Sequence, residues 1–458
     1  MIQSARIQPL NALPPRNSGR YVLYWMQASQ RAAFNPALEY AIERANALGL
    51  PVQVVFALTG FPEANARHYA FMLQGLADVA VRLVARGIGF SLRYGAVDPV
   101  VTELAHDAAL VVCDRGYLRV QRDWRRTLAA ALNCKLVQVE GDVVVPVRVA
   151  SPHHEYAART IRPKLHRVWE DYIEDMAPRA LSVPVQALVE SDAPLDDLED
   201  VIAHLDLARA PAPVRRFHGG ETRARARLEA FLDEGLSRYA GERQKPEAHA
   251  ASLLSPYLHF GQISPVEIAL AVRAAGASAP ESRAKFLEEL IVRRELAINH
   301  VLHEPRYDTF ESLPDWAQRA LDKASADPRP HLYTAAQFEA GATHDPYWNA
   351  AMREMTATGY MHNQMRMYWG KKVLEWSASP REAFATLLYL NNKYFLDGRD
   401  ANSFTNIGWI FGLHDRPWGP QPVFGTVRSM GQNTFKKFDA PAYVRDVERM
   451  TAAERNPV

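Results

Sequence analysis

The hydrophobic pattern of the sequence changes between about residue 180 and residue 215, and this change limits the chain to a fold of two unlike parts. Before it, short β-branched runs alternate with longer segments whose apolar residues recur at helical spacing. The predicted strands are Arg20–Met26, Pro51–Leu58, Gly89–Tyr94, Leu110–Cys113 and Lys135–Val139. The predicted helices between them are Pro36–Gly49, Arg67–Gly87 and Pro99–Asp107. This alternation is typical of a doubly wound parallel α/β sheet, whose ligands lie beyond the carboxyl ends of the strands.

After residue 215 the hydrophobic pattern indicates helices only. Residues 181–214 are rich in proline and acid, with one short helical candidate, and predict a long interdomain linker over the surface. The later segments with an apolar stripe are Glu221–Tyr239, Pro265–Ala275, Ser282–His300, Ala335–Ala340, Trp348–Thr356, Gln364–Trp376 and Pro380–Asn391. We therefore expect an α/β domain over residues 1–180, the linker over 181–214 and an all-α domain over 215–458.

Composition excludes several classes of protein. Two cysteines, Cys113 and Cys134, cannot build a disulfide framework, so we expect a reducing compartment, with the cytoplasm as the default, and no metal held by cysteine. No apolar run is long enough for a membrane span, and the first residues lack a secretory core. The 53 basic and 52 acidic residues do not make a strongly basic domain. The first strand is not followed by GxGxxG, which argues against a dinucleotide site at that point.

The segment 361–400 carries the most chemistry. On its predicted helix, Trp369 and Trp376 fall on or near one face, with Arg366 one turn before Trp369. One interpretation is that these tryptophans only pack in the core. The other is that they form a chain of redox-active indoles leading to a flavin. The stretch 390–400 favours the second, because two asparagines, two carboxylates and an arginine in eleven residues need a polar ligand or mutual pairing when buried.

Two further segments are weak indications when taken alone. Ser252 and Ser255 can donate hydrogen bonds to phosphate, although serines near a helix start, such as Ser264, are ordinarily only caps. Further along, a charge pair at i,i+4 such as Glu289 and Arg293 normally marks a solvated helix face. Neither segment identifies a function by itself.

The segment Asn406–Phe438 combines aromatic and basic residues. Between Asp415 and Asp439 there are four basic residues and no acid, and Trp409 and Trp418 stand at the start. Positive charge interleaved with aromatic rings is used to hold a phosphate backbone while a displaced base is stacked. A local basic face of this kind makes a nearly neutral chain compatible with DNA binding.

Together these segments resemble the photolyase/cryptochrome family, and specifically the class II cyclobutane pyrimidine dimer photolyases. The motifs that carry the resemblance are RHYAFMLQGL, SLLSPYLHFGQIS, FLEELIVRREL, MRMYWGKKVLEW, LDGRD, GLHDRPWG and PVFG. They occur in the order and at the spacing of that class, over nearly the whole chain. The resemblance implies an α/β antenna domain, a long linker and a helical domain that holds FAD in a U-shaped conformation.

The resemblance also implies a cofactor site. The residues that match the flavin phosphate-binding stretch are Tyr239, Ser252, Leu254 and Ser255. Arg366 and Asp397 match the charge pair beside the isoalloxazine ring, and Asp400 lies in the same loop. Asn391 matches the asparagine that faces flavin N5. The residues that match the electron-transfer tryptophans of the class, through which the flavin is photoreduced from the surface, are Trp348, Trp369 and Trp376.

Contacts with DNA are implied in the same way. Glu289 matches the glutamate that hydrogen-bonds a base carbonyl of the dimer, and in a desolvated pocket it can stay protonated and donate. Trp409 matches a tryptophan that packs on the flipped dimer. The residues expected to contact the lesion strand or to fill the gap in the duplex are Arg243, Gln244, Arg416 and Arg428.

Three positions depart from the expected pattern. Val292 stands where many photolyases outside this class carry an aromatic residue, and Gln244 replaces an asparagine. Asn392 sits where an aspartate is common. The first two departures affect substrate contacts and leave the electron-transfer residues unchanged.

The sequence therefore predicts a deoxyribodipyrimidine photo-lyase, which acts on double-stranded DNA containing cyclobutane pyrimidine dimers. In light, excited reduced FAD gives an electron to the flipped-out dimer. We expect a monomer, and no motif identifies an antenna chromophore, so a deazaflavin or another pigment stays open. One alternative is a cryptochrome-like flavin photosensor without repair, which binding to damaged DNA discriminates. The other is a nucleotide-binding enzyme whose tryptophans only pack, which a colourless preparation favours.

Overall fold

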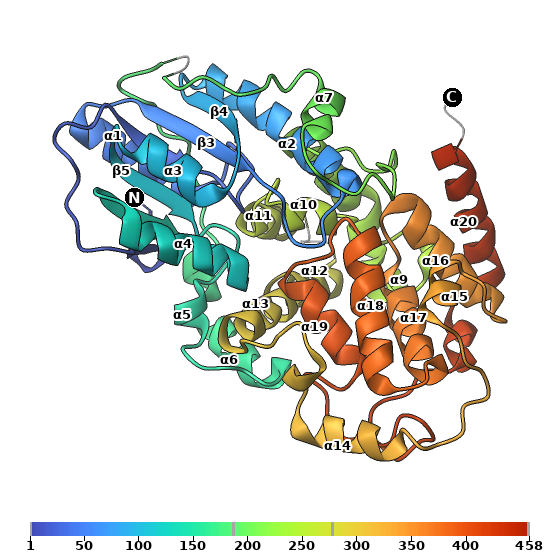
Figure 1. Cartoon of the computed structure of the whole chain (residues 1–458). Coiled ribbons are helices and arrows are strands. Elements are labelled where there is room, and N and C mark those ends of the chain that lie inside the picture. Colours follow the sequence, from blue (N-terminus) through green and yellow to red (C-terminus); the bar gives the residue numbers. More distant parts are fainter. Residues whose placement is uncertain (1, 186–187, 276–278, 456–458) are drawn as a thin grey trace.

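In the computed structural model, a six-stranded sheet forms the N-terminal part of the chain (Figure 1). The structure describes residues 2–185, 188–275 and 279–455. The strands are β1 (Ile7–Pro9), β2 (Tyr21–Trp25), β3 (Val52–Leu58), β4 (Gly89–Tyr94), β5 (Ala108–Asp114) and β6 (Lys135–Val139), in the order β1-β6-β5-β2-β3-β4. The five predicted strands are confirmed and pair in parallel. The antiparallel edge strand β1 corrects the all-parallel expectation, since its three residues are too few to show a strand pattern.

Helices cover both faces of this sheet. The helices α1 (Pro36–Leu48) and α2 (Ala66–Ala85) pack on one face, and α3 (Val97–Ala105) and α4 (Arg119–Ala131) pack on the other. Alternate residues of β2 divide between the two cores, as the period of two in a strand requires. The helix α4 was not predicted, because only Arg125 and Leu128 of its residues are buried and its apolar stripe is narrow.

The segment after residue 180 runs along the outer side of the sheet. The amide of Val185 donates to the carbonyl of Gly87 over 2.8 Å, and the amide of Asp192 donates to the carbonyl of Leu92 over 2.8 Å. One short helix, α7 (Leu198–Ala203), packs on α2. Residues 186 and 187 of the predicted linker lie outside the described residues, and the domain limits at residues 180 and 215 stay predictions.

The rest of the described chain is helical (Figure 1). Its helices are α5 (Val147–Ala150), α6 (Ala158–Val168), α8 (Glu221–Ala230), α9 (Tyr239–Glu242), α10 (Ser255–His259), α11 (Pro265–Ala275), α12 (Pro280–Leu287), α13 (Arg294–His303), α14 (Asp315–Ala324), α15 (Ala335–Glu339), α16 (Pro346–Thr358), α17 (Asn363–Trp376), α18 (Pro380–Tyr394), α19 (Ala401–Ile410) and α20 (Ala440–Arg455). The seven predicted helical segments are confirmed, while α5, α6, α10, α14, α19 and α20 were not predicted. Beyond residue 215 the described residues form no strand, only an isolated bridge between Gln421 and Gly425.

Two hydrophobic cores hold the helical part together. One is built from α14 and from α16 to α20, and it contains three tryptophans. The other joins α8 and α10 to α13 with Ala158, Ile161 and Leu165 of α6. The helix α6 therefore packs against the helical part and not against the sheet. No helix among the described residues is long and apolar enough to cross a membrane.

Candidate functional site

Three buried tryptophans form a row between α16 and α17. Trp348 is 0% exposed, Trp369 2% and Trp376 3%. The Nε1 of Trp348 donates to the backbone carbonyl of Trp369 over 3.0 Å, and the ring centroids of Trp348 and Trp376 are 6.2 Å apart. Trp348, which comes from a different helix, therefore lies between the two tryptophans of α17.

The inner end of this row meets a charge pair. The ring of Trp369 lies 6.2 Å from that of Phe395, and the guanidinium carbon of Arg366 lies 3.8 Å from the centroid of Phe395. Arg366 donates to both carboxylate oxygens of Asp397 over 3.0 Å. The structure thus places Trp369, Arg366 and Asp397 in one continuous set of contacts.

The outer end of the row, Trp376, is buried under other aromatic side chains. The ring of Trp376 is surrounded by those of Tyr333, His344 and His331, at centroid distances of 5.9, 4.8 and 6.4 Å. The two histidines are exposed. These three side chains therefore separate Trp376 from solvent.

Asn391 lies in the last turn of α18, inside a polar cluster. Its Nδ2 donates to Asn392 Oδ1 over 2.9 Å and to Ser403 Oγ, and no described residue donates to its Oδ1. Asn392 Nδ2 donates to Glu63 Oε2 over 2.5 Å. An aspartate at position 392 would bring two carboxylates together, so the amide suits this site. Mutual pairing accounts for much of the polar density that the sequence shows here.

Two other residues of this loop face the sheet part. Arg399 adopts a left-handed φ of 65°, its Nη1 lies 2.8 Å from His68 Nε2 of α2, and it donates to the carbonyl of Asn392 over 2.7 Å. Burial and the charge of Arg399 hold the pKa of His68 well below its ordinary value, so the ring is neutral, with Nδ1 accepting from the amide of Asn65 over 3.1 Å. Asp400 caps α19 by accepting from the amide of Ser403 over 2.8 Å, and its Oδ2 lies 3.6 Å from His259 Nδ1.

The predicted phosphate-binding stretch leads into the short helix α10. Leu253 adopts a left-handed φ of 57°, which costs energy for a residue with a branched side chain and turns the adjoining amides. Leu254 precedes the helix without a side-chain cap, and no described residue hydrogen-bonds the hydroxyls of Ser252 or Ser255. Donors thus remain free for an anionic ligand. Tyr239 packs against Phe286 at 5.4 Å, and burial raises the pKa of its phenol to about 12.

Glu289 lies on a π-helical turn that spans Glu288–Arg293. Residues five apart are neighbours in a π-helix, and accordingly Arg293 Nε lies 3.4 Å from Glu288 Oε1. The i,i+4 pair of Glu289 with Arg293 is therefore wrong, and Glu289 instead accepts from Arg243 Nη1 over 3.0 Å. The Glu289 side chain is 42% exposed.

Two positions that depart from the expected pattern, Val292 and Gln244, lie on or near this turn. Val292 is fully buried, so this position, at which an aromatic residue is common outside the class, does not reach the surface. Gln244 is exposed beside Arg243 at the end of α9. The π-helical turn thus brings together Arg243 and Glu289, two residues that the sequence had assigned to DNA contacts.

Cations of the segment after α19 surround two indoles, Trp409 at the end of α19 and Trp418 beyond it. We call Trp409, Arg416, Trp418 and Arg428 the basic–aromatic loop. The guanidinium of Arg428 lies 6.0 Å from the ring centroid of Trp409 and 4.8 Å from that of Trp418, and Arg416 lies 5.3 Å from Trp418. Trp418 is 39% exposed and its Nε1 donates to Asp415 over 3.2 Å. The combination predicted from the sequence is thus present on the surface.

A cavity of about 190 Å³ lies where the strand ends of the sheet face the helical part. Trp25, Phe56 and Trp124 line it from the sheet side, and His259 and Asp400 line it from the helical side. The strand order reverses between β2 and β5, which is where open α/β sheets bind ligands. The sequence had predicted this crevice without identifying its walls.

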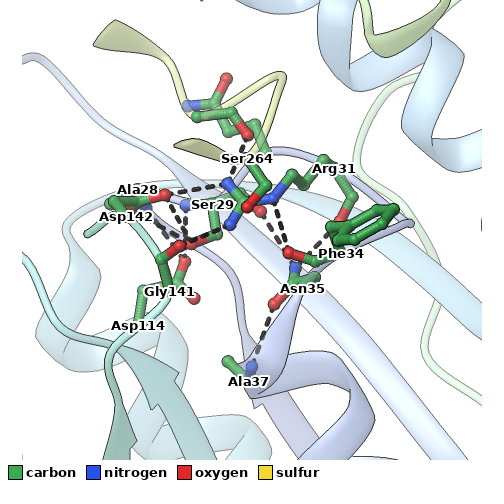
Figure 2. A network of polar contacts seen from close by, with 12 residues as sticks. Ala28, Ser29, Arg31, Phe34, Asn35, Ala37, Asp114, Gly141, Asp142 and Ser264 are labelled. Carbon is green, nitrogen blue, oxygen red and sulfur yellow. Dashed lines mark hydrogen bonds and ion pairs between the residues drawn. The ribbon is translucent and has the colours of Figure 1, made fainter. Parts of the chain in front are cut away.

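Figure 2 shows a buried polar joint that includes Arg31, Asp114 and Asp142, of which Asp142 also lines this cavity. Arg31 is 0% exposed and donates to Asp142 Oδ1 over 2.8 Å and to the carbonyl of Gly261 over 2.9 Å. Asp114 accepts from the amides of the loop after β2, and burial beside the charge of Asp142 raises its pKa. Gly261 has φ 63°, and a Cβ there would lie 1.8 Å from a backbone oxygen of that loop. The joint therefore fixes the α10 segment against the strand ends.

Sequence reasoning missed several residues of this site. Phe395 links Trp369 to Arg366, Ser403 accepts from Asn391, and His259 adjoins Asp400. Phe395 and Ser403 flank the motif LDGRD, and their closeness to a matched motif was the available signal. His259 lies inside SLLSPYLHFGQIS, but a lone histidine at a helix end gives no indication of a partner.

A row of buried indoles that ends on an ion pair suits the movement of an electron, in a chain that joins an α/β part to a helical part. Residues 22–184 match the family model of DNA photolyase, and residues 286–375 match that of the FAD binding domain of DNA photolyase. The chain belongs to the DNA photolyase family.

Relatives support this membership over nearly the full length. A deoxyribodipyrimidine photo-lyase of Methanothermobacter thermautotrophicus is 45% identical, over 97% of this chain and 98% of its own. One of Potorous tridactylus is 37% identical, over 93% and 81%. A bacterial class III photolyase from Agrobacterium tumefaciens shares the fold, with a TM-score of 0.71 at 20% identity, over 96% of this chain and 90% of its own.

Proposed function

We propose that the protein is a class II type deoxyribodipyrimidine photo-lyase, which repairs cyclobutane pyrimidine dimers in DNA by light-driven electron transfer. The proposal rests on one observation: the same chain holds a buried tryptophan row and an exposed basic–aromatic loop. The first suits movement of an electron, and the second suits the binding of a displaced base and its phosphates. The named relatives at 45% and 37% identity support the same activity.

The residues present fit FAD. The free hydroxyls of Ser252 and Ser255 and the amides turned by Leu253 offer donors to phosphate, and the Nε1 of Trp369 is buried without a partner among the described residues. FAD, when bound, supplies the excited electron that opens the cyclobutane ring and receives it back. Arg366 and Asp397 would hold opposite charges beside the ring system. Asn391 would offer the free Oδ1 of its amide, or its Nδ2 after rotation, to a ring nitrogen.

The exposed residues would hold the damaged strand. Glu289 is accessible and fixed by Arg243, so its carboxyl can meet a base carbonyl when a dimer displaces solvent. Trp409 offers a partly exposed indole for stacking. Arg243, Gln244, Arg416 and Arg428 would bind the strand or fill the gap that the extruded dimer leaves, which offsets part of the unstacking cost.

The interdomain cavity suits a second, planar chromophore such as a deazaflavin. Aromatic side chains line its sheet side, and four polar atoms at its walls have no partner among the described residues, which are Gln27 Oε1, Gln27 Nε2, Gln30 Oε1 and His259 Nδ1. A heterocycle with donors and acceptors on one edge would satisfy them. Absorption and fluorescence spectra of the purified protein test this, since flavin and deazaflavin bands differ.

Repair of an oligonucleotide with a single dimer under blue light tests the function. The FAD-loaded protein, chemically reduced, should restore the pyrimidines in light and not in darkness. Glu289→Ala should lower the repair yield more than the FAD content, whereas loss of FAD would contradict the place assigned to Glu289. A protein whose flavin is photoreduced but which leaves the dimer intact and does not prefer damaged DNA would be a photosensor.

Two finer proposals concern the state of the protein. We propose that it acts as a monomer, because the exposed loop must reach an extended duplex. We also propose the cytoplasm as its compartment. Both cysteines are free and buried, which suits a reducing environment.

A further inference from the structure

Lys371 is a buried lysine that none of the roles above uses. It is 1% exposed and lies on α17, two residues after Trp369. Its Nζ donates to the backbone carbonyl of Ile410 over 2.5 Å and lies 5.0 Å from the ring centroid of Trp409. The ammonium therefore sits directly against the indole that we assign to the dimer.

The surroundings of Lys371 are unusual for a buried charge. No described carboxylate forms an ion pair with it, although buried ammonium groups ordinarily need one. Its partners are the terminal carbonyl of α19, where the helix dipole favours a cation, and the face of the indole. The charged groups that face it are Asp415 and Arg428, both from the segment after α19.

The neighbouring Lys372 shows the ordinary arrangement and offers a matched control. Its Nζ lies 5.5 Å from the ring centroid of Trp376, so it too contacts an indole of the site. It differs in forming an ion pair with Glu375 at 2.5 Å. A contact between lysine and indole therefore does not by itself require an unpaired charge, and the bare ammonium is particular to Trp409.

We propose that Lys371 is a positioning residue for damaged DNA, whose ammonium fixes the indole of Trp409 at the depth and angle at which it stacks on the flipped dimer. The inference rests on the proposed function, because it takes Trp409 as the stacking surface. Lys371 also ties the end of α19 to α17, so the indole and its backbone are held by one side chain. Arg428 borders the same ring at 6.0 Å, toward the surface.

The contact should respond to pH near neutrality. Burial lowers the pKa of Lys371 to about 7, against the ordinary value of a lysine. As the pH rises through this value the ammonium loses its charge, and its attraction to the indole weakens. The preference of the wild type for dimer-containing DNA should then fall toward that of Lys371→Met, whose own preference should not depend on this titration.

The first experiment observes the contact without DNA. In FAD-loaded protein with 15N-labelled tryptophan, the indole N–H signal of Trp409 is assigned by its loss in Trp409→Phe. It should shift between about pH 5.5 and about pH 8.5 in the wild type. It should not titrate in Lys371→Met or in Lys371→Arg, which keeps its charge. The same titration in Lys371→Met as in the wild type would overturn the contact.

The second experiment measures binding in darkness to dimer-containing and undamaged duplexes. Lys371→Met should weaken binding to the dimer by roughly 2- to 30-fold, the range of one cation–π contact, and leave the undamaged duplex unchanged. Lys371→Arg should rescue binding, and Lys372→Met should bind as the wild type does. Lys371→Met should add nothing in a Trp409→Phe background.

Each contrary outcome has a distinct meaning. An equal loss from Lys371→Met with and without Trp409 would overturn the positioning role, because Lys371 would then act elsewhere. A wild type that does not prefer the dimer would overturn the proposed function and the positioning role with it, while the indole titration would still decide whether the contact exists. Should Lys371→Met fail to fold, the wild-type pH profile and Lys371→Arg decide the question.

Discussion

The two groups of tryptophans in the helical part differ in charge and exposure, although both touch α17. Trp348 and Trp369 are buried and have no lysine or arginine against their rings among the described residues. Trp409 is partly exposed and lies between Lys371 and Arg428. One residue type thus occupies two electrostatic environments within a single domain.

This difference in charge suits the two groups of tryptophans to different roles, electron transfer and base stacking. Removing an electron from an indole 5.0 Å from an ammonium costs about 3 kcal/mol more than in its absence, at an effective dielectric constant of about 20. Trp409 is therefore a poor electron donor and a good surface for stacking. No described lysine or arginine lies against the rings of Trp348 and Trp369, so this energetic cost does not apply to them. Charge placement, more than the count of tryptophans, indicates which indoles carry electrons.

Trp376 is an instructive intermediate case. It is buried like its neighbours in the row, yet Lys372 lies 5.5 Å from its ring. The ion pair of Lys372 with Glu375 places a negative charge beside that ammonium. The row thus stays electrostatically neutral along its length because a carboxylate offsets its only neighbouring ammonium among the described residues.

The largest effect should come from breaking the row at its inner end. Trp369→Phe should slow photoreduction of bound flavin by at least an order of magnitude, because the indole nearest Phe395 and Arg366 is lost, while chemically reduced protein should still repair dimers. Bleaching of the flavin absorption under blue light, with an external reductant, measures the first activity. Equal loss of both activities would show that the indole is structural.

Trp369 is a cleaner target than Trp348. The Nε1 of Trp369 has no partner among the described residues, so phenylalanine removes no hydrogen bond there. In Trp348→Phe the bond to the carbonyl of Trp369 is lost, which should cost about 1 kcal/mol of stability. Urea unfolding of the two variants separates this structural cost from the loss of electron transfer.

The next effect should come from removing the stacking surface. Trp409→Ala should weaken binding to dimer-containing DNA by about 1–3 kcal/mol, a factor of roughly 5 to 150 in Kd, since one base loses its stacking partner. Photoreduction of the flavin without DNA should stay at the wild-type rate. A slowed photoreduction in this variant would mean that Trp409 donates electrons, and the separation of the two groups would fail.

A smaller effect should follow from unbalancing the charge near Trp376. Glu375→Gln leaves the ammonium of Lys372 bare beside that indole, so photoreduction should slow several-fold, and less than in Trp369→Phe. The double variant Lys372→Met with Glu375→Gln restores neutrality and should recover the wild-type rate. Unchanged photoreduction in the single variant would show that the charge at this end of the row is unimportant.

The sequence predicts the fold well because its signals are local. Strands such as β3 and β5 contain continuous apolar runs, and helices such as α2 keep a clear apolar stripe. The helix α4 was not predicted because most of its side chains are polar. The helix α19 was not predicted because its sequence ANSFTNIGWI mixes polar and apolar residues without a stripe. Motif resemblance named the candidate site residues, which spacing alone does not identify.

What sequence reasoning could not find depends on packing between distant segments. Trp348 meets the carbonyl of Trp369 only because α16 and α17 pack together. The π-helical turn at 288–293 shifts every later side chain, which a period of 3.6 residues cannot show. The joint of Arg31 with Asp142 spans 111 residues of chain, and neither residue has a sequence signal of its own.

The smallest effect should come from the exposed cations of the basic–aromatic loop. Arg428→Ala should lower the slope of log binding constant against log salt by about 0.9, the amount expected for one phosphate contact. Because a phosphate contact carries no information about the lesion, damaged and undamaged duplexes should weaken alike. Arg126→Ala, on an exposed face of α4, controls for a general loss of charge. A loss confined to the dimer would instead mean that Arg428 acts by supporting Trp409, as Lys371 does from the buried side.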